Sequence, residues 1–384
     1  MNDDQAIELL EQIVRISSVS TEEAELAHWL AAELPRCGFR AHVDAVGNLR
    51  ASIGREDAPI DGVLLGHIDT VPGDLPVMRT RMPDPRGEPW QERLFGRGAV
   101  DAKGPLACFV AAAVRAVAQR PELRLEIIGC IEEEVPSSRG ARHVLDRTPP
   151  DFCVVGEPSG WDGVTLGYKG CLNARLVFRG PGHHGAHADA SVCERASDAW
   201  QRMQQAARAF GGESLYDSLL VRLAAMESAH HEDGTDSATL TVSLRLPESL
   251  PPQEARAWLA EHARATQILI DGEIAAWSGP RHSSLARTLQ RSILQAGGRP
   301  RAIRKTGTAD LNLVAPAWNC PAVAYGPGDA ALDHTPHEHI VLEEFRRGIA
   351  VLASALTAAA RPETDAAPGR SSAASGRCGA RADG

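Results

Sequence analysis

Histidine and acidic residues recur along most of this 384-residue chain, in short segments that also contain glycine or proline. Imidazole and carboxylate groups are ligands that suit zinc, cobalt or manganese, and such a site needs no thiolate. The segments in this order therefore predict a site for two divalent metal ions with a carboxylate base beside them. The residues concerned are His67 and Asp69 in LLGHIDTVPG, Asp101 in GRGAVDAKGP, Glu133 and Glu134 in IEEEVPSSRGA, Glu157 in VVGEPSG, and His334 in GPGDAALDHTPHEH.

The residue types also suggest how the ligands are shared between the two metals. Two ions about 3.5–4 Å apart need a ligand that bridges them, usually a carboxylate with its two oxygens. Asp101 is the natural bridge, because each remaining segment supplies one further ligand. We expect His67 and Glu157 to complete one metal, and Glu134 with His334 to complete the other.

Two acidic residues next to these ligands have other predicted roles. Asp69 follows His67 by two residues, so on an extended strand end it points the same way and can accept the second N–H of the imidazole. Glu133 precedes the ligand Glu134 and is free to face a water between the metals. This placement predicts Glu133 as the general base.

Three of these segments directly follow apolar runs. Val63–Leu65 precedes His67, Leu125–Cys130 precedes the three glutamates, and Phe152–Val155 precedes Glu157. Such runs are typical of buried strands, and ligands at the ends of neighbouring strands would lie on one edge of an α/β sheet. A single His-x-Asp pair or a run of glutamates is more often a surface feature, so the hypothesis depends on the segments occurring together.

These segments resemble those of the M20 family of dinuclear-zinc metallopeptidases and deacylases, over about residues 1 to 360. GHIDTVPGDLPV, GRGAVDAKGPLA, EEEVPSSRGAR and the HTPHEH ending are similar to M20 enzymes in general. GEPSGWDGVTLGYKG resembles the branch in lysine biosynthesis, whose members release lysine or ornithine from the small acidic carrier protein LysW. The resemblance implies two zinc ions per chain, with cobalt as an alternative, and the same ligand, base and Asp69 roles.

The resemblance also implies further site residues. Family members place a histidine of a smaller domain over the partner subunit's active site, where it bonds to the tetrahedral intermediate. In FRGPGHHGAHADA that position falls on His184, although the usual proline after it is missing and the loop could have no catalytic part. Arg245 is assigned either to substrate binding or to structural pairing. Gly307–Asp310 resembles a Gly-Thr-Ser-Asp turn with Ala309 for serine, so a backbone donor at Thr308 is retained.

Composition narrows the class of protein. The chain has 43% hydrophobic and 23% charged residues, which is ordinary globular usage, and its net charge of −10 argues against nucleic-acid binding. That charge favours an acidic carrier protein only if basic residues cluster around the cleft. The eight cysteines form no CxxC pair, and we find neither a signal peptide nor a membrane-spanning stretch, so we expect a cytoplasmic enzyme without a membrane partner.

The order of apolar patterns predicts an α/β fold, a mixed-sheet zinc-peptidase catalytic domain with an inserted α+β dimerisation, or lid, domain. Residues 1–171 and 279–361 would form the catalytic domain, and residues 172–278 the insertion, with two helices on one face of a sheet. We expect a homodimer. Residues 362–384 are small and polar and predict a disordered tail. Ser20 or Thr21 is the expected N-cap of the second helix, and Glu273–Trp277 the last strand of the insertion.

The predicted function is metal-dependent hydrolysis of an amide, releasing lysine or ornithine from an N-acylated precursor linked to LysW in lysine or arginine biosynthesis. The alternative is another M20 amidohydrolase, such as N-acetylornithine deacetylase, succinyl-diaminopimelate desuccinylase or a carboxypeptidase, since all share the metal site. A non-catalytic protein on a decayed hydrolase fold would have lost ligands or the base, and every one of these residues is present.

Overall fold

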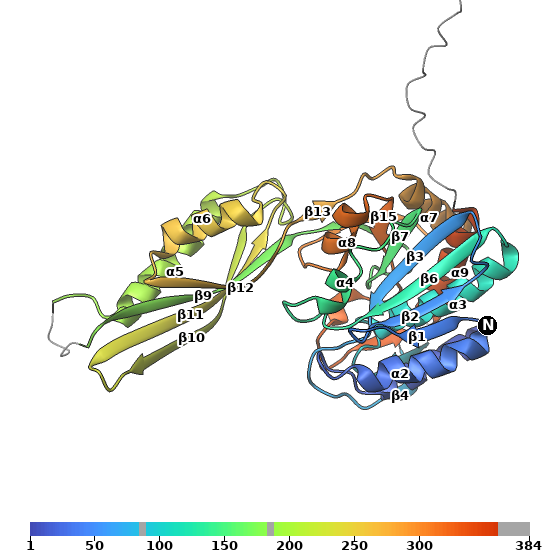
Figure 1. Cartoon of the computed structure of the whole chain (residues 1–384), viewed down its shortest axis with the longest axis horizontal. Helices are drawn as coiled ribbons and strands as arrows, with labels where there is room; N and C mark the ends of the chain where they lie inside the picture. Colours follow the sequence, from blue (N-terminus) through green and yellow to red (C-terminus); the bar gives the residue numbers. More distant parts are fainter. Residues whose placement is uncertain (84–89, 183–187, 360–384) are drawn as a thin grey trace, which may run out of the picture.

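The computed structural model describes residues 1–83, 90–182 and 188–359. Within them the chain builds a large mixed sheet flanked by helices and, to one side, a four-stranded sheet with two helices (Figure 1). His184 and the predicted tail at 362–384 lie outside the described residues.

The large sheet has its most buried strands at its centre. In the strand Ile60–His67, Val63 and Leu65 pack into one apolar cluster and Leu64 into another, so both faces of the strand are covered. Such strands appear as continuous apolar runs because helices lie on both sides. The strand order is β1 (Arg40–Val43), β2 (Leu49–Ile53), β6 (Leu123–Cys130), β3 (Ile60–His67), β7 (Phe152–Gly156), β15 (Ala322–Ala324), β8 (Gly163–Tyr168) and β13 (Trp277–Ser278), with β14 (Arg301–Lys305) paired to β8.

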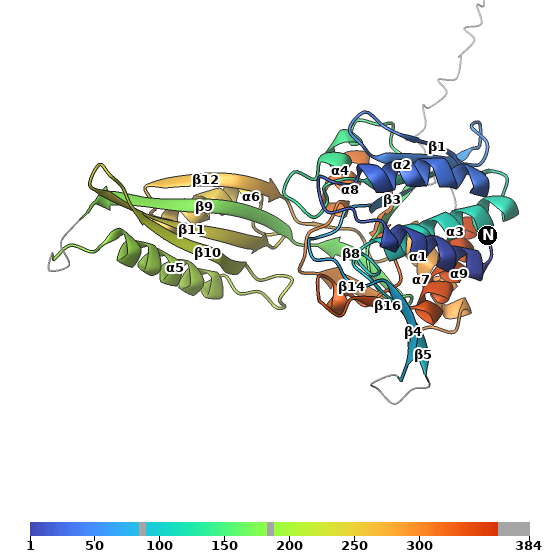
Figure 2. The ribbon, with the colours of Figure 1, turned by 90° about the horizontal axis from the view of Figure 1, so that it is seen from below.

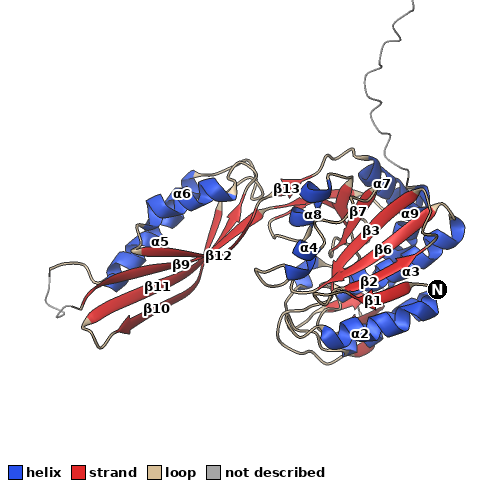
Figure 3. Ribbon diagram, in the orientation of Figure 1, coloured by secondary structure: helices blue, strands red, loops and turns tan. Residues whose placement is uncertain are grey.

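Helices cover the two faces of this sheet unequally (Figure 3). The larger cluster contains residues of α1 (Asp3–Arg15), α2 (Ala24–Glu33), α3 (Lys103–Gln119), α7 (Ser284–Gln295) and α9 (Leu342–Ala358). The smaller cluster contains residues of α4 (Arg139–His143) and α8 (Leu311–Trp318). Short 3₁₀ helices occupy Leu34–Cys37 and Ala330–Leu332.

A small three-stranded sheet extends from the same part of the molecule. Its order is β16 (His339–Val341), β5 (Gln91–Phe95) and β4 (Met78–Met82), and β4 and β5 form an arm that projects from the body (Figure 2). The pairing of β16 with β5 is antiparallel and brings His339 opposite Phe95. Two segments that are far apart in the chain therefore meet beside the large sheet.

The four-stranded sheet is antiparallel and lies beside the large sheet (Figure 1). Leu240, Val242 and Leu244 alternate with polar residues along its central strand, which is the pattern of a sheet with one covered face. Its order is β10 (Leu220–His230), β11 (Thr235–Leu246), β9 (Gly170–Pro181) and β12 (Gln267–Ile274), and α5 (Val192–Ala209) and α6 (Pro252–Ala263) pack on the covered face.

Two local predictions were wrong. Helix α2 begins at Ala24 after Glu23, with no side-chain cap, and Thr21 has a left-handed φ of 77°, so neither Ser20 nor Thr21 is its N-cap. The last strand of the insertion is Gln267–Ile274, and Trp277 already pairs with Tyr168 of the large sheet. In the second case a pairing with a strand distant in sequence decides where the element ends.

Candidate metal centre

Three of the predicted site segments leave the large sheet at the same edge. β3 pairs in parallel with both β6 and β7, with His67 opposite Cys130 and Gly66 opposite Gly156. Glu133 and Glu134 follow β6, and Glu157 follows β7. The carboxyl ends of parallel strands are where α/β folds place their sites, because the connecting loops converge there.

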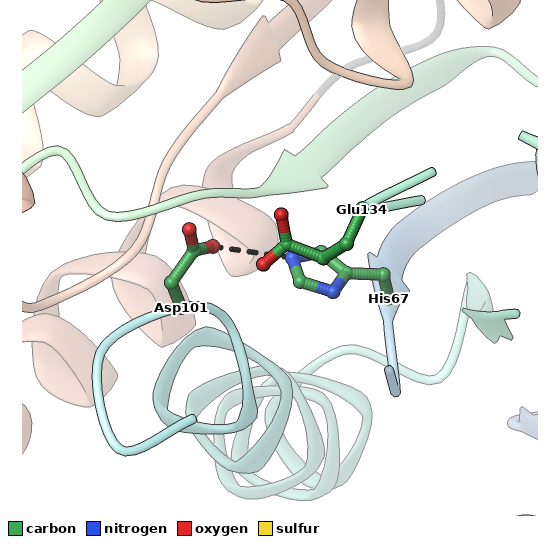
Figure 4. A group of neighbouring side chains, drawn as sticks. All are labelled: His67, Asp101 and Glu134. Atoms are coloured by element: carbon green, nitrogen blue, oxygen red, sulfur yellow. Dashed lines mark hydrogen bonds and ion pairs between the residues drawn. The ribbon is translucent and has the colours of Figure 1, made fainter. Parts of the chain in front are cut away.

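Asp101 lies between two histidines. Its Oδ1 is 3.2 Å from Nε2 of His67, and its Oδ2 is 3.2 Å from Nε2 of His334. The side chain comes from the loop just before α3, while His67 ends β3 (Figure 4). One carboxylate oxygen therefore faces each imidazole, which is the arrangement expected of a bridging ligand.

Glu134 completes this group. Its Oε1 is 2.9 Å from Nε2 of His334, and one ligand atom each of His67, Asp101 and Glu134 lie within 4.8 Å of one another (Figure 4). Glu157 is buried and lines the same cleft. Four of the five expected ligands thus line one cleft, and His67 contacts one of them, Asp101. The tightest group joins Glu134, rather than Glu157, to His67.

The electrostatics of the group are strongly perturbed. Burial raises the pKa of Glu157 to about 8, with the charge of Asp101 adding to the effect. Hydrogen bonds with Asp101 and Glu134 raise the pKa of His334 to about 10. Burial opposes the charged form of Asp101, but the two histidines outweigh it and lower its pKa. Carboxylates crowded in this way favour any cation that can lie between them.

Glu133 lines the cleft next to Glu134. Loss of hydration raises the pKa of Glu133 well above its usual range; His67 opposes this shift, and the charge of Glu157 adds to it. A carboxyl group with a raised pKa can both accept and return a proton near neutral pH. The position is the one predicted for the base.

Asp69 has more contacts than we predicted. The Nδ1 of His67 is 2.9 Å from the main-chain oxygen of Asp69 and 3.4 Å from its Oδ1. The two carboxylate oxygens accept the backbone N–H groups of Glu133 and Glu134, each at 3.0 Å, and one also accepts the Ser20 hydroxyl at 2.7 Å. Asp69 therefore holds the segment of the predicted base Glu133 and the expected ligand Glu134, as well as His67.

The two predicted substrate-binding residues contact one another across the two sheets. Nη1 of Arg245, on β11, donates to Oγ1 of Thr308 at 3.0 Å, and that hydroxyl donates to the main-chain oxygen of Lys169 at 3.1 Å. Both residues line the cleft. His184 lies outside the described residues, so its predicted contact stays a prediction.

The cleft has a volume of about 1140 Å³ and is bounded by both sheets. Its walls include four of the expected ligands and, from the four-stranded sheet, Cys171, Asn173 and Gly272. Strand β14 adds the basic side chains of Arg301, Arg304 and Lys305. Basic residues therefore cluster at the cleft in spite of the net charge of −10.

Sequence reasoning did not include several buried acids near the ligands. Both side-chain oxygens of Asp310 are buried without a hydrogen-bond partner among the described residues, and burial raises its pKa to about 7. Asp333 directly precedes His334, and burial raises its pKa to about 9. Glu338 is 1% exposed. All three acids lie in the sequence segments that contain Thr308 or His334, so their positions next to predicted site residues could have identified them.

The comparisons with known proteins agree on one family. The model of Peptidase family M20/M25/M40 matches residues 63–358. The LysW-lysine hydrolase of Deinococcus radiodurans is 42% identical over 92% of this chain and 96% of that protein. The LysW-lysine/LysW-ornithine hydrolase of Sulfurisphaera tokodaii is 26% identical over 88% of this chain and 91% of that protein.

Solved structures share the fold at low sequence identity. An M20 family metallo-carboxypeptidase from Sulfolobus solfataricus superposes with a TM-score of 0.75 at 18% identity, covering 93% of this chain and 99% of that one. A dinuclear metal binding peptidase of the M20 family from Bacillus subtilis gives 0.62 at 13%, covering 93% and 98%. Across the described residues, no helix combines the length and apolar character needed to cross a bilayer.

Proposed function

The chain belongs to Peptidase family M20/M25/M40, and on this premise we propose that it hydrolyses the amide that joins lysine or ornithine to the carrier protein LysW. Two relatives are named as hydrolases of LysW-linked lysine or of LysW-linked lysine and ornithine, and the match covers more than nine tenths of each of them. The observation that carries the proposal is the carboxylate of Asp101, with one oxygen 3.2 Å from His67 and the other 3.2 Å from His334.

The donor set fits two zinc ions, with cobalt as a substitute. It offers imidazoles and carboxylates but no thiolate, the ligand chemistry of hydrolytic zinc sites. Crowding also favours divalent cations, because burial and mutual repulsion raise the pKa values of Glu134 and Glu157. His67, Asp101, Glu134, Glu157 and His334 would hold the metals, which when bound lower the pKa of a water and polarise the carbonyl of the amide.

Glu133 would carry the proton. It takes a proton from the attacking water and returns it to the leaving amine, a role worth about 10²–10⁴-fold in rate. Asp69 orients it through the Glu133 N–H and keeps the His67 imidazole in place. Arg245 and Thr308 lie at the cleft wall and would bind the substrate, with the Thr308 backbone as a candidate donor to the oxyanion.

The cleft is compatible with a protein-bound substrate. Three basic residues of β14, Arg301, Arg304 and Lys305, line it. Cationic side chains in the cleft wall suit an acidic carrier, because complementary charge speeds encounter and fixes orientation. The negative charge of the chain as a whole therefore does not oppose such a partner locally.

We further propose that the enzyme is a cytoplasmic homodimer in which residues 172–278 form the dimerisation domain and His184 reaches the partner's active site. The support is the separate four-stranded sheet, whose strand β10 pairs only with β11 among the described strands. An edge strand of this kind can pair with another chain.

A substrate panel tests the function. LysW-γ-lysine, LysW-γ-ornithine, N-acetylornithine, N-acetyllysine and N-succinyl-diaminopimelate would be incubated with the zinc-loaded enzyme, and free amino acid measured. The carrier-linked substrates should be cleaved with the highest kcat/KM. The Glu133→Ala variant, purified in parallel, controls for contaminating hydrolases. Preference for a small acyl group would instead assign the chain to another M20 amidohydrolase.

A further inference from the structure

Glu338 is a buried carboxylate that the reaction scheme leaves without a role. It is 1% exposed and follows the ligand His334 by four residues. A buried charge of this kind is strongly destabilising unless it is hydrogen-bonded or paired. Its partners therefore indicate what it does.

Among the described residues, the hydrogen bonds of the Glu338 side chain all lead to the segment that carries Asp101. Oε1 accepts the backbone N–H of Val100 at 3.0 Å and that of Asp101 itself at 3.2 Å. Oε2 accepts Nη1 of Arg97 at 2.6 Å. Both oxygens are thus engaged by protein donors.

The main chain makes the same connection. Glu338 directly precedes β16, which pairs with β5, and the N–H of Gly96, just after β5, donates to the main-chain oxygen of Glu338 at 3.3 Å (Figure 2). The pairing of β5 with β16 thus places Glu338 beside the loop of Asp101. The side chain then fixes the part of that loop that the strands do not reach.

Asp69 provides a parallel at the other histidine. It follows His67 by two residues and accepts the N–H groups of Glu133 and Glu134. In each case a buried carboxylate on a histidine segment holds the backbone of an acidic ligand from a distant segment. The two carboxylates differ in their further partners, which are His67 and Ser20 for Asp69 and Arg97 for Glu338.

We infer that Glu338 is a positioning residue that sets the bridging carboxylate of Asp101 relative to His334. It rests on the proposed function, because Asp101 and His334 must hold metal for their spacing to matter. Glu338 would not bind metal itself, since its oxygens are taken by three N–H donors. Loss of the contacts should let the Asp101 loop shift and weaken metal binding, as removal of residues that orient ligands commonly does by about 10–100-fold.

The test measures zinc affinity rather than activity. Wild type, Glu338→Gln and Glu338→Asp would be stripped of metal and titrated with zinc in competition with a chromophoric chelator. Glu338→Gln keeps the size of the side chain but loses one acceptor and the charge facing Arg97, so zinc affinity should fall by about 10–100-fold. Glu338→Asp keeps the charge at a shorter reach, and its loss should be smaller.

Glu343→Gln is the matched control. Glu343 lies five positions further along the same segment, its side chain is 59% exposed, and it pairs with Arg347. This variant should bind zinc as wild type does. Thermal unfolding of the metal-free proteins, followed by circular dichroism, reports the purely structural contribution of each residue.

Three outcomes separate the hypotheses. Weaker zinc binding in both Glu338 variants supports the inference, and Glu338→Asp decides the matter if Glu338→Gln does not fold. Wild-type zinc affinity together with a lowered unfolding temperature would show that Glu338 only stabilises the fold, and would overturn the inference. Failure of the wild type to bind two zinc ions would overturn the proposed function instead, and the inference with it.

Discussion

The edge of the large sheet and the inserted four-stranded sheet contain charged residues in opposite environments. At the edge of the large sheet, Asp69, Glu157 and Glu338 are buried. In the inserted sheet, Arg175 pairs with Asp271 where their side chains are 52% and 33% exposed. Buried charges persist only where other groups compensate for lost hydration, whereas surface pairs contribute about 0–1 kcal/mol. The first region therefore holds buried carboxylates beside the expected metal ligands, whereas this pair of the second region is open to solvent.

The two regions are nevertheless tied together at their connections. The side-chain amide of Asn312 donates to the main-chain oxygens of Tyr168 at 3.3 Å, Lys169 at 3.2 Å and Ala275 at 2.8 Å, so it bonds to both crossings between the sheets. The Lys169 ammonium donates to the main-chain oxygens of Leu215, Tyr216 and Ser218 in the inserted region. These hydrogen bonds join the connections beside the cleft wall that carries Arg245.

Metal removal should have the largest effect on hydrolysis, because the proposed reaction takes place at the metal centre. Exhaustive chelation is expected to abolish hydrolysis, and zinc or cobalt should restore it. Elemental analysis of the active protein should give two metals per chain. Full activity in a preparation proven to contain no metal would show that hydrolysis does not depend on a metal centre at the edge of the large sheet.

The second prediction separates two neighbours within the metal centre. Glu133→Ala should lower kcat by about 10²–10⁴-fold, the usual worth of a general base, while metal content stays near that of wild type. Glu134→Ala should instead lose metal. Equal metal loss in both variants, measured by elemental analysis, would mean that the two roles are exchanged.

The third prediction asks whether the inserted region also enters the chemistry. His184→Ala should lower kcat by about 10²–10³-fold, the cost of removing a donor to an oxyanion. Mixed with Glu133→Ala chains, it should regain activity, because one site of the heterodimer then has both wild-type groups.

Confirmed subunit exchange is needed for that experiment, and mass spectrometry of the mixed dimer provides it. Exchange without recovery would place His184 in the site of its own chain or outside catalysis. The inserted region would then contribute no group to the active site of the partner.

The smallest effect is expected at the surface of the inserted sheet. Asp271→Asn removes the partner of Arg175, whose side chain is 52% exposed, and should leave the free energy of unfolding close to that of wild type, because solvent screens the pair. Denaturant titration measures the change, with Arg175→Gln as the companion variant. A loss of several kcal/mol would show that this pair is coupled to structure beyond the sheet surface.

Much of the site could be predicted because its ligands follow apolar strands in short, distinctive segments. The runs before His67, Glu133 and Glu157 predict buried strands, and parallel strands bring their ends together by geometry alone. The ends of elements were less predictable, since Trp277 left the inserted sheet to pair with Tyr168.

The sequence by itself determined the kinds of ligands, their order and the strands that carry them, because side-chain chemistry and apolar periodicity are local properties. Only the tertiary structure decided which groups hold those ligands in place. Ser20 was predicted to cap a helix, yet its hydroxyl donates to Asp69, and Glu338 binds the backbone of Asp101, 237 positions away. Neither contact follows from a local pattern, because a serine hydroxyl can donate to many acceptors and any residue can offer a backbone N–H. The packing of distant segments selects which groups meet.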